Sequence, residues 1–271
     1  MTPFGRQVVL EFGLPGQQGR RFRDLSVTFK VEMTQTATPN TAHIEARNLG
    51  ADSVALLQRD DVVVRLMVGY DAPRLIFQGD PIRNGVDERY EGTDRVLRMQ
   101  LQDGGRTYRL GRVSVSFATA TTLGQVLDAV TDQLGLPLGV QDVDRTVGLG
   151  RGVVLQGPAR QVLDHIAEAS GSRWSIIDGA LNIVSRTGEL TNQAVVFSAD
   201  RGNLVGSPSR KDKGTVEVKG LITPSLRPGK PFRVESAFLT GDYIATEVDF
   251  VGGLRDQDFY VVARGRPRRS S

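Results

Sequence analysis

With 271 residues, the chain is long enough to bury a sizeable core in one large all-β domain or in two to three small domains. It has no cysteine, which excludes disulfides, thiolate metal sites and cysteine nucleophiles, and its two histidines, His43 and His165, are far apart in sequence, which disfavours zinc sites and Ser-His-Asp triads. The net charge of +3 is small, no run approaches the ~18 apolar residues of a membrane span, and Arg6 and Glu11 interrupt the first apolar run, so we expect no membrane segment and no signal peptide.

The opening segment, residues 1–112, is predicted to be β throughout. Residues 25–33 alternate between apolar and polar side chains, which is typical of a β-strand with one buried face. Pro39-Asn40 favours a turn, and the alternation resumes over residues 41–49, so the sequence predicts a β-hairpin. The expected buried face is Leu25, Val27, Phe29, Val31 and Met33, and the expected polar face is Ser26, Thr28, Lys30 and Glu32.

Further short strands are predicted in the same segment, separated by clear turn signals. Asn84-Gly85 and Asp103-Gly104-Gly105 favour turns, and residues 51–58 favour one short helix. Many short strands with regular turns indicate a small barrel or sandwich. The expected strands are residues 8–12, 62–68, 74–77 and 97–101.

The middle segment, residues 113–189, changes character and predicts an α+β module. Thr121-Thr122 can cap one helix, and a second starts near Pro158 and ends before Gly171; both contain the tetrapeptide Gln-Val-Leu-Asp. That repeat indicates either a duplicated helix-strand unit or only a tetrapeptide that is common in amphipathic helices. Asp178-Gly179-Ala180 between two apolar runs predicts a hairpin. The side chains expected to bury together are Val126, Leu127, Val130, Val162, Leu163, Ile166 and Trp174.

The last segment, residues 190–271, returns to β, and its tail after Arg264 is predicted to be disordered. The fold class is therefore mainly β with an inserted α+β module. We expect two β-barrels of similar topology, built mainly from residues 1–112 and 190–265. The strands expected in this segment are residues 195–197, 215–218, 232–235, 243–250 and 259–262.

Several short sequence motifs along the whole chain resemble motifs of the baseplate hub proteins of tailed bacteriophages. This is the late control protein D-like family, whose members have two tail tube-like barrels. The family phrase "G-L-I-G-x-P" corresponds to residues 203–208, and "L-L-x-P-x-L-x-P-G" to residues 221–229. Residues 171–181 are similar to the family hairpin "G-x-x-W-x-x-x-x-G-x-L", and residues 38–49, Gly69-Tyr70 and residues 76–79 are similar to the opening domain. One departure is that residues 250–253 stand where many relatives carry His-Gly-Asp.

The resemblance implies a structural, non-enzymatic protein with no catalytic, cofactor-binding or metal-binding residues. It implies a homotrimer whose six barrels form a pseudo-six-fold ring, since repeated head-to-tail interfaces can close a ring. Such a hub joins the tail tube to the tip or spike and lines the channel for DNA ejection. The implied partners are tail tube or distal tail subunits, the spike or tip protein and other baseplate subunits, with phage DNA only in passage. The implied location is the virion, after synthesis in the host cytoplasm.

Residues that could carry other chemistry are few. Residues 148–152 are glycine-rich but lack the third glycine of a dinucleotide loop and any following Gly-Lys-Ser/Thr, so a plain loop is expected. The carboxylate pairs could bind a cation or act as acid and base, but their turn-like contexts favour solvated surface. His43 is expected to be exposed and His165 to be packed beside an apolar helix face, while the basic residues 264–269 could contact nucleic acid or a neighbouring subunit. The carboxylate pairs are Asp60-Asp61, Asp87-Glu88 and Asp142/Asp144.

Two other functions remain open from the sequence. A carbohydrate- or protein-binding β module would need exposed aromatic side chains on one face, and only 6% of the residues are aromatic. A hydrolase of cell-wall material is permitted by the carboxylate pairs but lacks the expected catalytic motifs.

Overall fold

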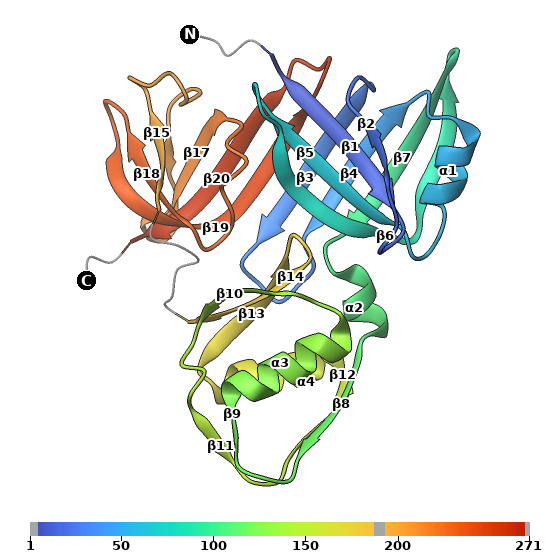
Figure 1. The fold of residues 1–271 in the computed structure, drawn as a ribbon. Coiled ribbons are helices and arrows are strands. Elements are labelled where there is room, and N and C mark those ends of the chain that lie inside the picture. The colour runs from blue at the N-terminus through green and yellow to red at the C-terminus, as the bar shows by residue number, and fades with distance from the viewer. Residues whose placement is uncertain (1–4, 187–192, 269–271) are drawn as a thin grey trace. The chain divides into compact units, whose positions relative to one another are not determined.

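The computed structural model describes residues 5–186 and 193–268, which form two compact units (Figure 1). The first unit contains residues 1–35, 40–103 and 191–271, so it includes both β segments of the sequence. The second unit contains residues 36–39 and 104–190. Each is described by itself below. The three-domain division remains a prediction, and its second boundary, at 189, lies outside the described residues.

The first β segment forms an antiparallel set in the order β3-β4-β7-β6-β5-β1, with β2 beyond β1. Strands β3 and β4 are the predicted hairpin, paired from Val27↔Ala46 to Glu32↔Thr41. The predicted helix is α1 (Ala51–Leu57). The strands are β1 (Gln7–Gly13), β2 (Arg20–Phe22), β3 (Val27–Thr34), β4 (Thr41–Arg47), β5 (Val63–Gly69), β6 (Arg74–Glu91) and β7 (Asp94–Gln102).

The second β segment repeats this order of strands: β16-β17-β20-β19-β18-β15. The strands also follow one another along the chain as in the first segment, so β16 corresponds to β3, β19 to β6 and β20 to β7. One difference is that β15 runs parallel to β18, whereas β1 runs antiparallel to β5. The elements are β15 (Val195–Ser198), β16 (Ser209–Arg210), η1 (Asp212–Gly214), β17 (Val216–Leu221), β18 (Pro231–Glu235), β19 (Thr240–Gly253) and β20 (Phe259–Pro267).

The second segment closes on itself through Asn203. The backbone amide of Leu221 in β17 donates to the carbonyl oxygen of Asn203 (2.9 Å), and the Asn203 side chain bonds Ser198 and Val196 of β15 (2.8 and 2.7 Å). One asparagine thus connects β15, the last strand of this order, with β17, the second strand, which satisfies backbone groups that open strand edges would expose.

The predicted alternation of the first strand is confirmed for Val27, Phe29, Val31 and Met33, which are buried, while Lys30 is exposed. Leu25 differs: it lies before β3 begins and is only partly buried against the core. One hydrophobic cluster runs through both β segments, from Val8 to Ala263. Their side chains therefore share a single core.

Two expectations for the first unit are wrong. Asn84-Gly85 is no hairpin turn, because both residues lie inside the 18-residue strand β6, where the register shifts between Pro81 and Val86. The positive φ of Asn84 (58°) serves this bulge. The chain after Arg264 is ordered as far as Arg268, because β20 continues to Pro267 along β19. Arg269 lies outside the described residues.

The second unit is the predicted α+β module. Thr122 caps α3 in a capping box with Gln125, and α4 begins after Pro158. Asp178 and Gly179, both with positive φ, make the predicted tight turn between β13 and β14. The elements are α2 (Gly105–Leu110), β8 (Arg112–Phe117), β9 (Thr121–Thr122), α3 (Leu123–Leu134), β10 (Leu138–Asp142), β11 (Gly148–Gly150), β12 (Val153–Pro158), α4 (Ala159–Ala169), β13 (Ser172–Ile177) and β14 (Ala180–Ser185).

The core of the second unit contains all seven residues expected to bury together. Trp174 stacks on Tyr108 with ring centroids 5.3 Å apart, and its indole N–H donates to Asp164 (2.8 Å). A buried indole whose polar atom has a partner adds area to the core without a desolvation cost. Trp174 therefore has the anchoring role that the sequence predicts. No helix in residues 5–186 or 193–268 is long and apolar enough to cross a membrane.

Candidate assembly surface

The two β segments are joined edge to edge through β3 and β19. Seven residue pairs run antiparallel from Glu247↔Thr34 to Gly253↔Thr28. This pairing uses only the second half of β19, because the first half pairs with β18 through Thr240–Ile244. The result is one continuous sheet across both segments, visible where the red β19 and β20 adjoin the blue β3 in Figure 1.

Aromatic and cationic side chains reinforce one end of this junction. Phe259, at the start of β20, meets Phe29 of β3 and Tyr70 of the β5–β6 turn, with ring centroids 6.2 and 5.4 Å away. The guanidinium of Arg6 lies 5.2 Å from the Phe259 ring centroid and donates to the Asp256 carbonyl oxygen (2.6 Å). Edge-to-face rings and a cation over a ring contribute beyond the buried area. Burial raises the pKa of Tyr70.

A buried arginine ties a loop of the second segment to the first. Arg227 is only 7% exposed, and its guanidinium donates to the carbonyl oxygens of Pro224 and Leu226 (2.6 and 2.8 Å). Its other terminal nitrogen donates to the carbonyl oxygen of Leu75 in β6 (2.8 Å). A buried charge without hydrogen-bond partners would be costly, so moving the loop of residues 222–230 away from Leu75 is unfavourable. The arginine therefore holds this loop against β6.

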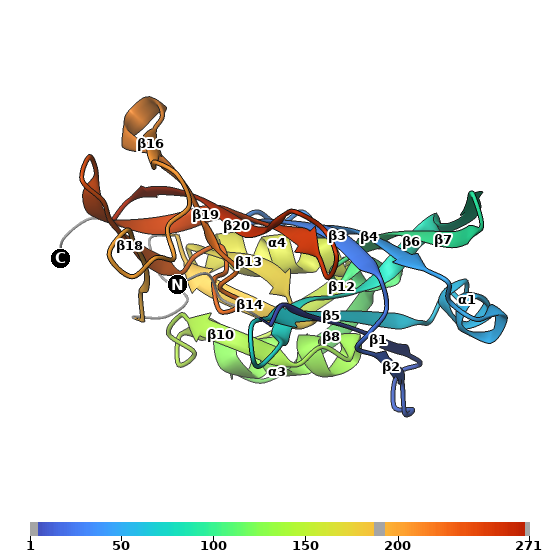
Figure 2. The ribbon, with the colours of Figure 1, turned by 90° about the horizontal axis from the view of Figure 1, so that it is seen from above.

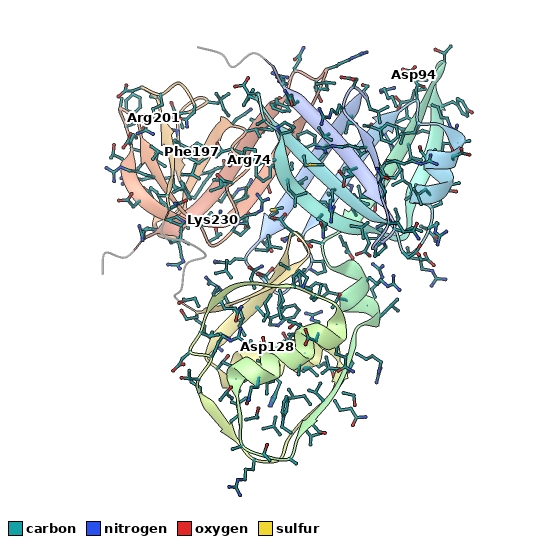
Figure 3. All side chains as sticks on the ribbon, in the orientation of Figure 1. Arg74, Asp94, Asp128, Phe197, Arg201 and Lys230 are labelled. Carbon is teal, nitrogen blue, oxygen red and sulfur yellow. The ribbon has the colours of Figure 1, made fainter. Side chains whose placement is uncertain are left out.

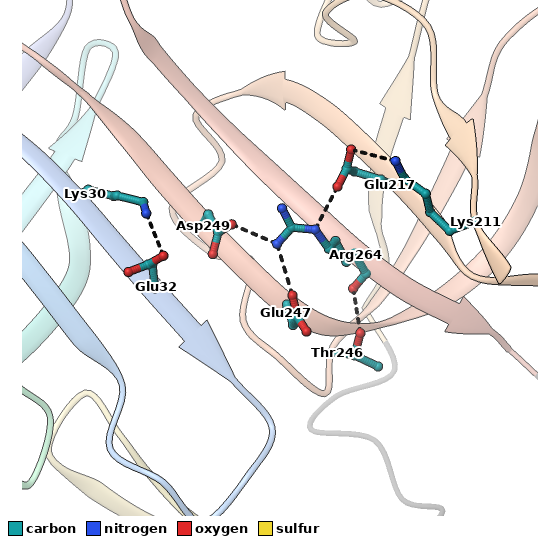
Figure 4. A network of polar contacts seen from close by, with 8 residues as sticks. All are labelled: Lys30, Glu32, Lys211, Glu217, Thr246, Glu247, Asp249 and Arg264. Carbon is teal, nitrogen blue, oxygen red and sulfur yellow. Dashed lines mark hydrogen bonds and ion pairs between the residues drawn. The ribbon is translucent and has the colours of Figure 1, made fainter. Parts of the chain in front are cut away.

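The polar face of the continuous sheet carries a network of charges centred on Arg264, shown in Figure 4. The Arg264 guanidinium bonds Glu217 (2.7 Å), Glu247 (3.0 Å) and Asp249 (3.0 Å), which lie on β17 and β19. Burial alone would lower the pKa of Arg264, but its three carboxylate partners raise it overall. The hydrogen bond to Arg264 lowers the pKa of Glu217, whereas burial raises the pKa of Asp249 against the opposing charge of Arg264.

Other basic side chains on this face are paired in the same manner. Arg98 of β7 forms an ion pair with Glu45 of β4 at 2.6 Å, and Lys30 forms one with Glu32 at 2.7 Å within β3. Arg47 of β4 bonds Glu91 of β6 at 2.9 Å. The arginine expected in a basic tail, Arg264, is thus engaged by carboxylates of its own sheet. This engagement disfavours a nucleic-acid contact by Arg264, while the contact considered for residues 264–269 as a whole stays a prediction.

Members of each carboxylate pair considered for chemistry have partners of their own in the described chain. Asp61 pairs with Arg59, Glu88 with Arg95, and the hydroxyls of Ser185 and Thr146 donate to Asp142 and Asp144. Hydrogen bonds from Thr146 lower the pKa of Asp144, and the Arg95 side chain lowers that of Glu88. Within residues 5–186 and 193–268 no three His, Cys, Asp or Glu side chains gather as metal ligands would.

Neither the two histidines nor the glycine-rich residues 148–152 form part of a site in the described chain. His43 is exposed on β4, as expected. His165 is exposed on α4 rather than packed, and it borders an apolar hollow of about 240 Å³ that also includes Leu123 and Val126. The helix turns its apolar stripe inward one position away, at Ile166, which leaves His165 at the rim. Residues 148–150 form the short strand β11 against Thr121-Thr122 rather than a loop.

Comparisons with known proteins place this fold among tail proteins. No family model and no curated protein matches the sequence. A tail protein from Neisseria meningitidis is similar in structure, with a TM-score of 0.64, 11% identity, and coverage of 97% of this chain and 96% of that chain. The 43 kDa tail protein of prophage MuSo2 from Shewanella oneidensis gives a TM-score of 0.61 at 11% identity, covering 97% and 98%.

A third similar structure is the c3393 protein of E. coli, with a TM-score of 0.62, 12% identity, and coverage of 96% and 77%. That protein is described as a component of the type VI secretion system with structural similarity to the T4 bacteriophage tail proteins gp27 and gp5. The chain therefore has the mainly β fold of phage tail proteins, with a large antiparallel sheet and few helices.

Proposed function

We propose that the chain is the structural hub of a phage tail baseplate, which joins the tail tube to the tip or spike. The observation that carries this proposal is the repeated strand order within one chain. A tube of six similar barrels and a three-fold tip can be matched by a trimer of chains that each supply two barrels. The full-length likeness to tail proteins supports the same assignment at the level of fold.

In this proposal the polar face of the continuous sheet lines the channel. An unpaired basic face would bind DNA phosphates with release of counterions and would retain the DNA. Here Arg264, Arg98 and Arg47 are each paired with carboxylates on the same face. Such a face lets DNA pass without holding it, as a channel for ejection requires, and no catalytic role is assigned to it.

The partners in this proposal are two further copies of the chain, tail tube or distal tail subunits, and a spike or tip protein. Its site of action is the virion, in the tail baseplate. A binding module for carbohydrate is not favoured, because the exposed aromatic residues Tyr90 and Phe238 lie on different hairpins, β6–β7 and β18–β19, in different β segments.

The test is an image of the particle that contains this protein, with its copies counted around the tail axis. Three copies arranged as a ring of six barrels are expected. Six copies around the axis, or a particle whose tail lacks the protein, would contradict the proposal.

A further inference from the structure

The junction inside the chain is a template for a junction between chains. Inside the chain, one edge of β19 pairs with two strands in turn. Its first half pairs with β18 of its own segment, and its second half pairs with β3 of the first segment. The repeated strand order makes β16 the counterpart of β3 and β6 the counterpart of β19. A second junction of the same kind would therefore pair β16 with the second half of β6.

The second half of β6 has the open edge that this pairing needs. Strand β5 pairs with β6 only over Arg74–Gly79, and β7 takes the opposite edge over Asp80–Glu91. In the described chain no strand pairs with the β5-side edge of residues 82–91. A hollow of about 330 Å³ lies beside it, between residues 57–60 at the end of α1 and residues 81–86. An unpaired edge of this length is a template for a further strand.

Two exposed aromatic residues lie at the turns that correspond to the two turns of an aromatic contact inside the chain, although Phe259 follows its turn and Tyr90 precedes its turn. Tyr70 of the β5–β6 turn packs on Phe259, which follows the β19–β20 turn. The corresponding turns are β18–β19, which carries Phe238, and β6–β7, which Tyr90 precedes. Phe238 is 86% exposed and Tyr90 is 73% exposed. Large aromatic side chains at such positions are typical of interface anchors.

We propose that β16 (Ser209–Arg210) of one copy pairs with the open edge of β6, residues 82–91, in the next copy, and that Phe238 of the first copy packs on Tyr90 of the second. This inference deepens the proposed function and rests on it, since it names the surfaces by which the trimer closes. The contact is heterologous, with different surfaces on the two copies, so repetition closes a ring rather than a two-fold dimer.

Several charges of the two surfaces are already paired within the chain: Lys211 pairs with Glu217, Glu88 with Arg95, and Glu91 with Arg47 and Arg89. The docking of the two surfaces therefore rests on backbone pairing and on the two aromatic side chains rather than on net charge. Figure 2 shows the stretch of chain that carries β16 projecting beyond the rest of its segment, while Ser209 and Arg210 pair with the start of β17.

Cysteine cross-linking tests this contact directly, because the natural chain has no cysteine. A chain carrying both Phe238→Cys and Tyr90→Cys, at its highest soluble concentration, is treated with a short thiol cross-linker and separated by mass under denaturing conditions. We expect a covalent series that ends at a closed trimer. Each single variant should give no species beyond a dimer. The matched control pairs Tyr90→Cys with Val154→Cys, an apolar side chain that is 66% exposed on β12 of the other unit, and should give no closed trimer.

A second measurement follows association without cross-linking. Phe238→Glu and Tyr90→Glu should each weaken self-association in sedimentation by about tenfold or more, as loss of an interface anchor does. Val154→Glu should not. All three side chains are exposed, so the fold should survive, and circular dichroism checks this.

The possible outcomes distinguish a failure of the assigned docking surfaces from a failure of the proposed trimeric hub. A native trimer that gives no Phe238–Tyr90 cross-link overturns the assigned surfaces and leaves the trimeric hub standing. A cross-linked series that continues past three copies supports the surfaces and contradicts the trimer. Chains that neither associate nor cross-link at the highest soluble concentration overturn the inference.

Discussion

At the residue scale, Arg264 shows how charges are arranged on the continuous sheet. Its guanidinium is shared by Glu217, Glu247 and Asp249, so removal leaves three carboxylates without their common partner. The side chain is 40% exposed, which reduces the energy at stake through solvent screening. Figure 3 shows side chains that end in nitrogen or oxygen atoms on both β segments, among them the labelled Arg74, Asp94 and Lys230.

We expect Arg264→Met to lower the free energy of unfolding by about 1 kcal/mol at neutral pH, as loss of partly exposed charged hydrogen bonds does. The control Arg266→Met, on the same strand, should change it by less than about 0.5 kcal/mol. Urea unfolding measures both. Equal effects of the two substitutions would contradict the role given to the network.

The deficit of Arg264→Met should shrink in acid. The pKa of Glu217 is lowered in the folded protein by Arg264, so its stabilisation is present above its unfolded pKa and is lost as the pH falls. The pKa of Asp249 is raised by burial, so its ionised form costs stability at neutral pH, and protonation relieves that cost as the pH falls through the folded pKa. Urea unfolding at about pH 7 and about pH 4, which brackets the carboxyl range, compares the variant with the natural chain. A deficit that grows in acid would show that the carboxylates do not cause it.

At the element scale, β17 passes close over an aromatic ring. A Cβ atom on Gly220 would lie 2.4 Å from the Phe197 ring, and Phe197 itself is fully buried. Hence β17 tolerates no side chain at the position where it closes the second segment. The backbone of Gly220 has no unusual φ, so the constraint is the close approach alone.

We expect Gly220→Ala to destabilise the protein by about 1–3 kcal/mol, as overpacking of a core does. In Gly148→Ala, where nothing lies within 4 Å of the added Cβ, the change should stay below about 0.5 kcal/mol. Thermal unfolding followed by circular dichroism measures both. Phe197→Leu combined with Gly220→Ala should recover part of the loss; additive losses would disprove the contact.

The helices of the second unit begin in two different manners. The Thr122 hydroxyl accepts a hydrogen bond from the Gln125 backbone amide, and the Gln125 side-chain oxygen accepts one from the Thr122 backbone amide. Pro158, in contrast, gives α4 no side-chain cap. Thr122→Ala should cost about 1 kcal/mol, the usual loss of an N-cap, and Thr122→Ser should cost much less because it keeps the acceptor. Unfolding followed by Trp174 fluorescence reads this unit. A serine variant as unstable as the alanine variant would argue against the cap.

At the scale of the whole molecule, each unit has its own hydrophobic core. The single tryptophan, Trp174, belongs to the second unit, so its fluorescence reports that unit, while circular dichroism is dominated by the strands of the first. Units with separate cores can unfold separately.

We therefore expect Phe197→Ala, a cavity in the first core, to destabilise the first unit by about 3–5 kcal/mol. The circular dichroism midpoint in urea should fall, and the Trp174 fluorescence midpoint should stay in place. If both midpoints fell together, the two units would be one cooperative structure.

The sequence by itself determined the elements with strong local patterns. The alternation of residues 27–33, the capped helix at Leu123–Leu134 and the Asp178-Gly179 turn are set by side-chain periodicity and backbone preference, which act over a few residues. The same local signals failed at Asn84-Gly85, where a turn dipeptide serves a bulge within β6, and at His165, which lies at the rim of a hollow. Only the tertiary structure decided the β3–β19 junction and the Arg264 network. The junction joins residues more than 200 positions apart, and the network joins residues 15 to 47 positions apart on three strands. A pairing edge leaves no periodic mark in either strand, because backbone groups rather than side chains make it.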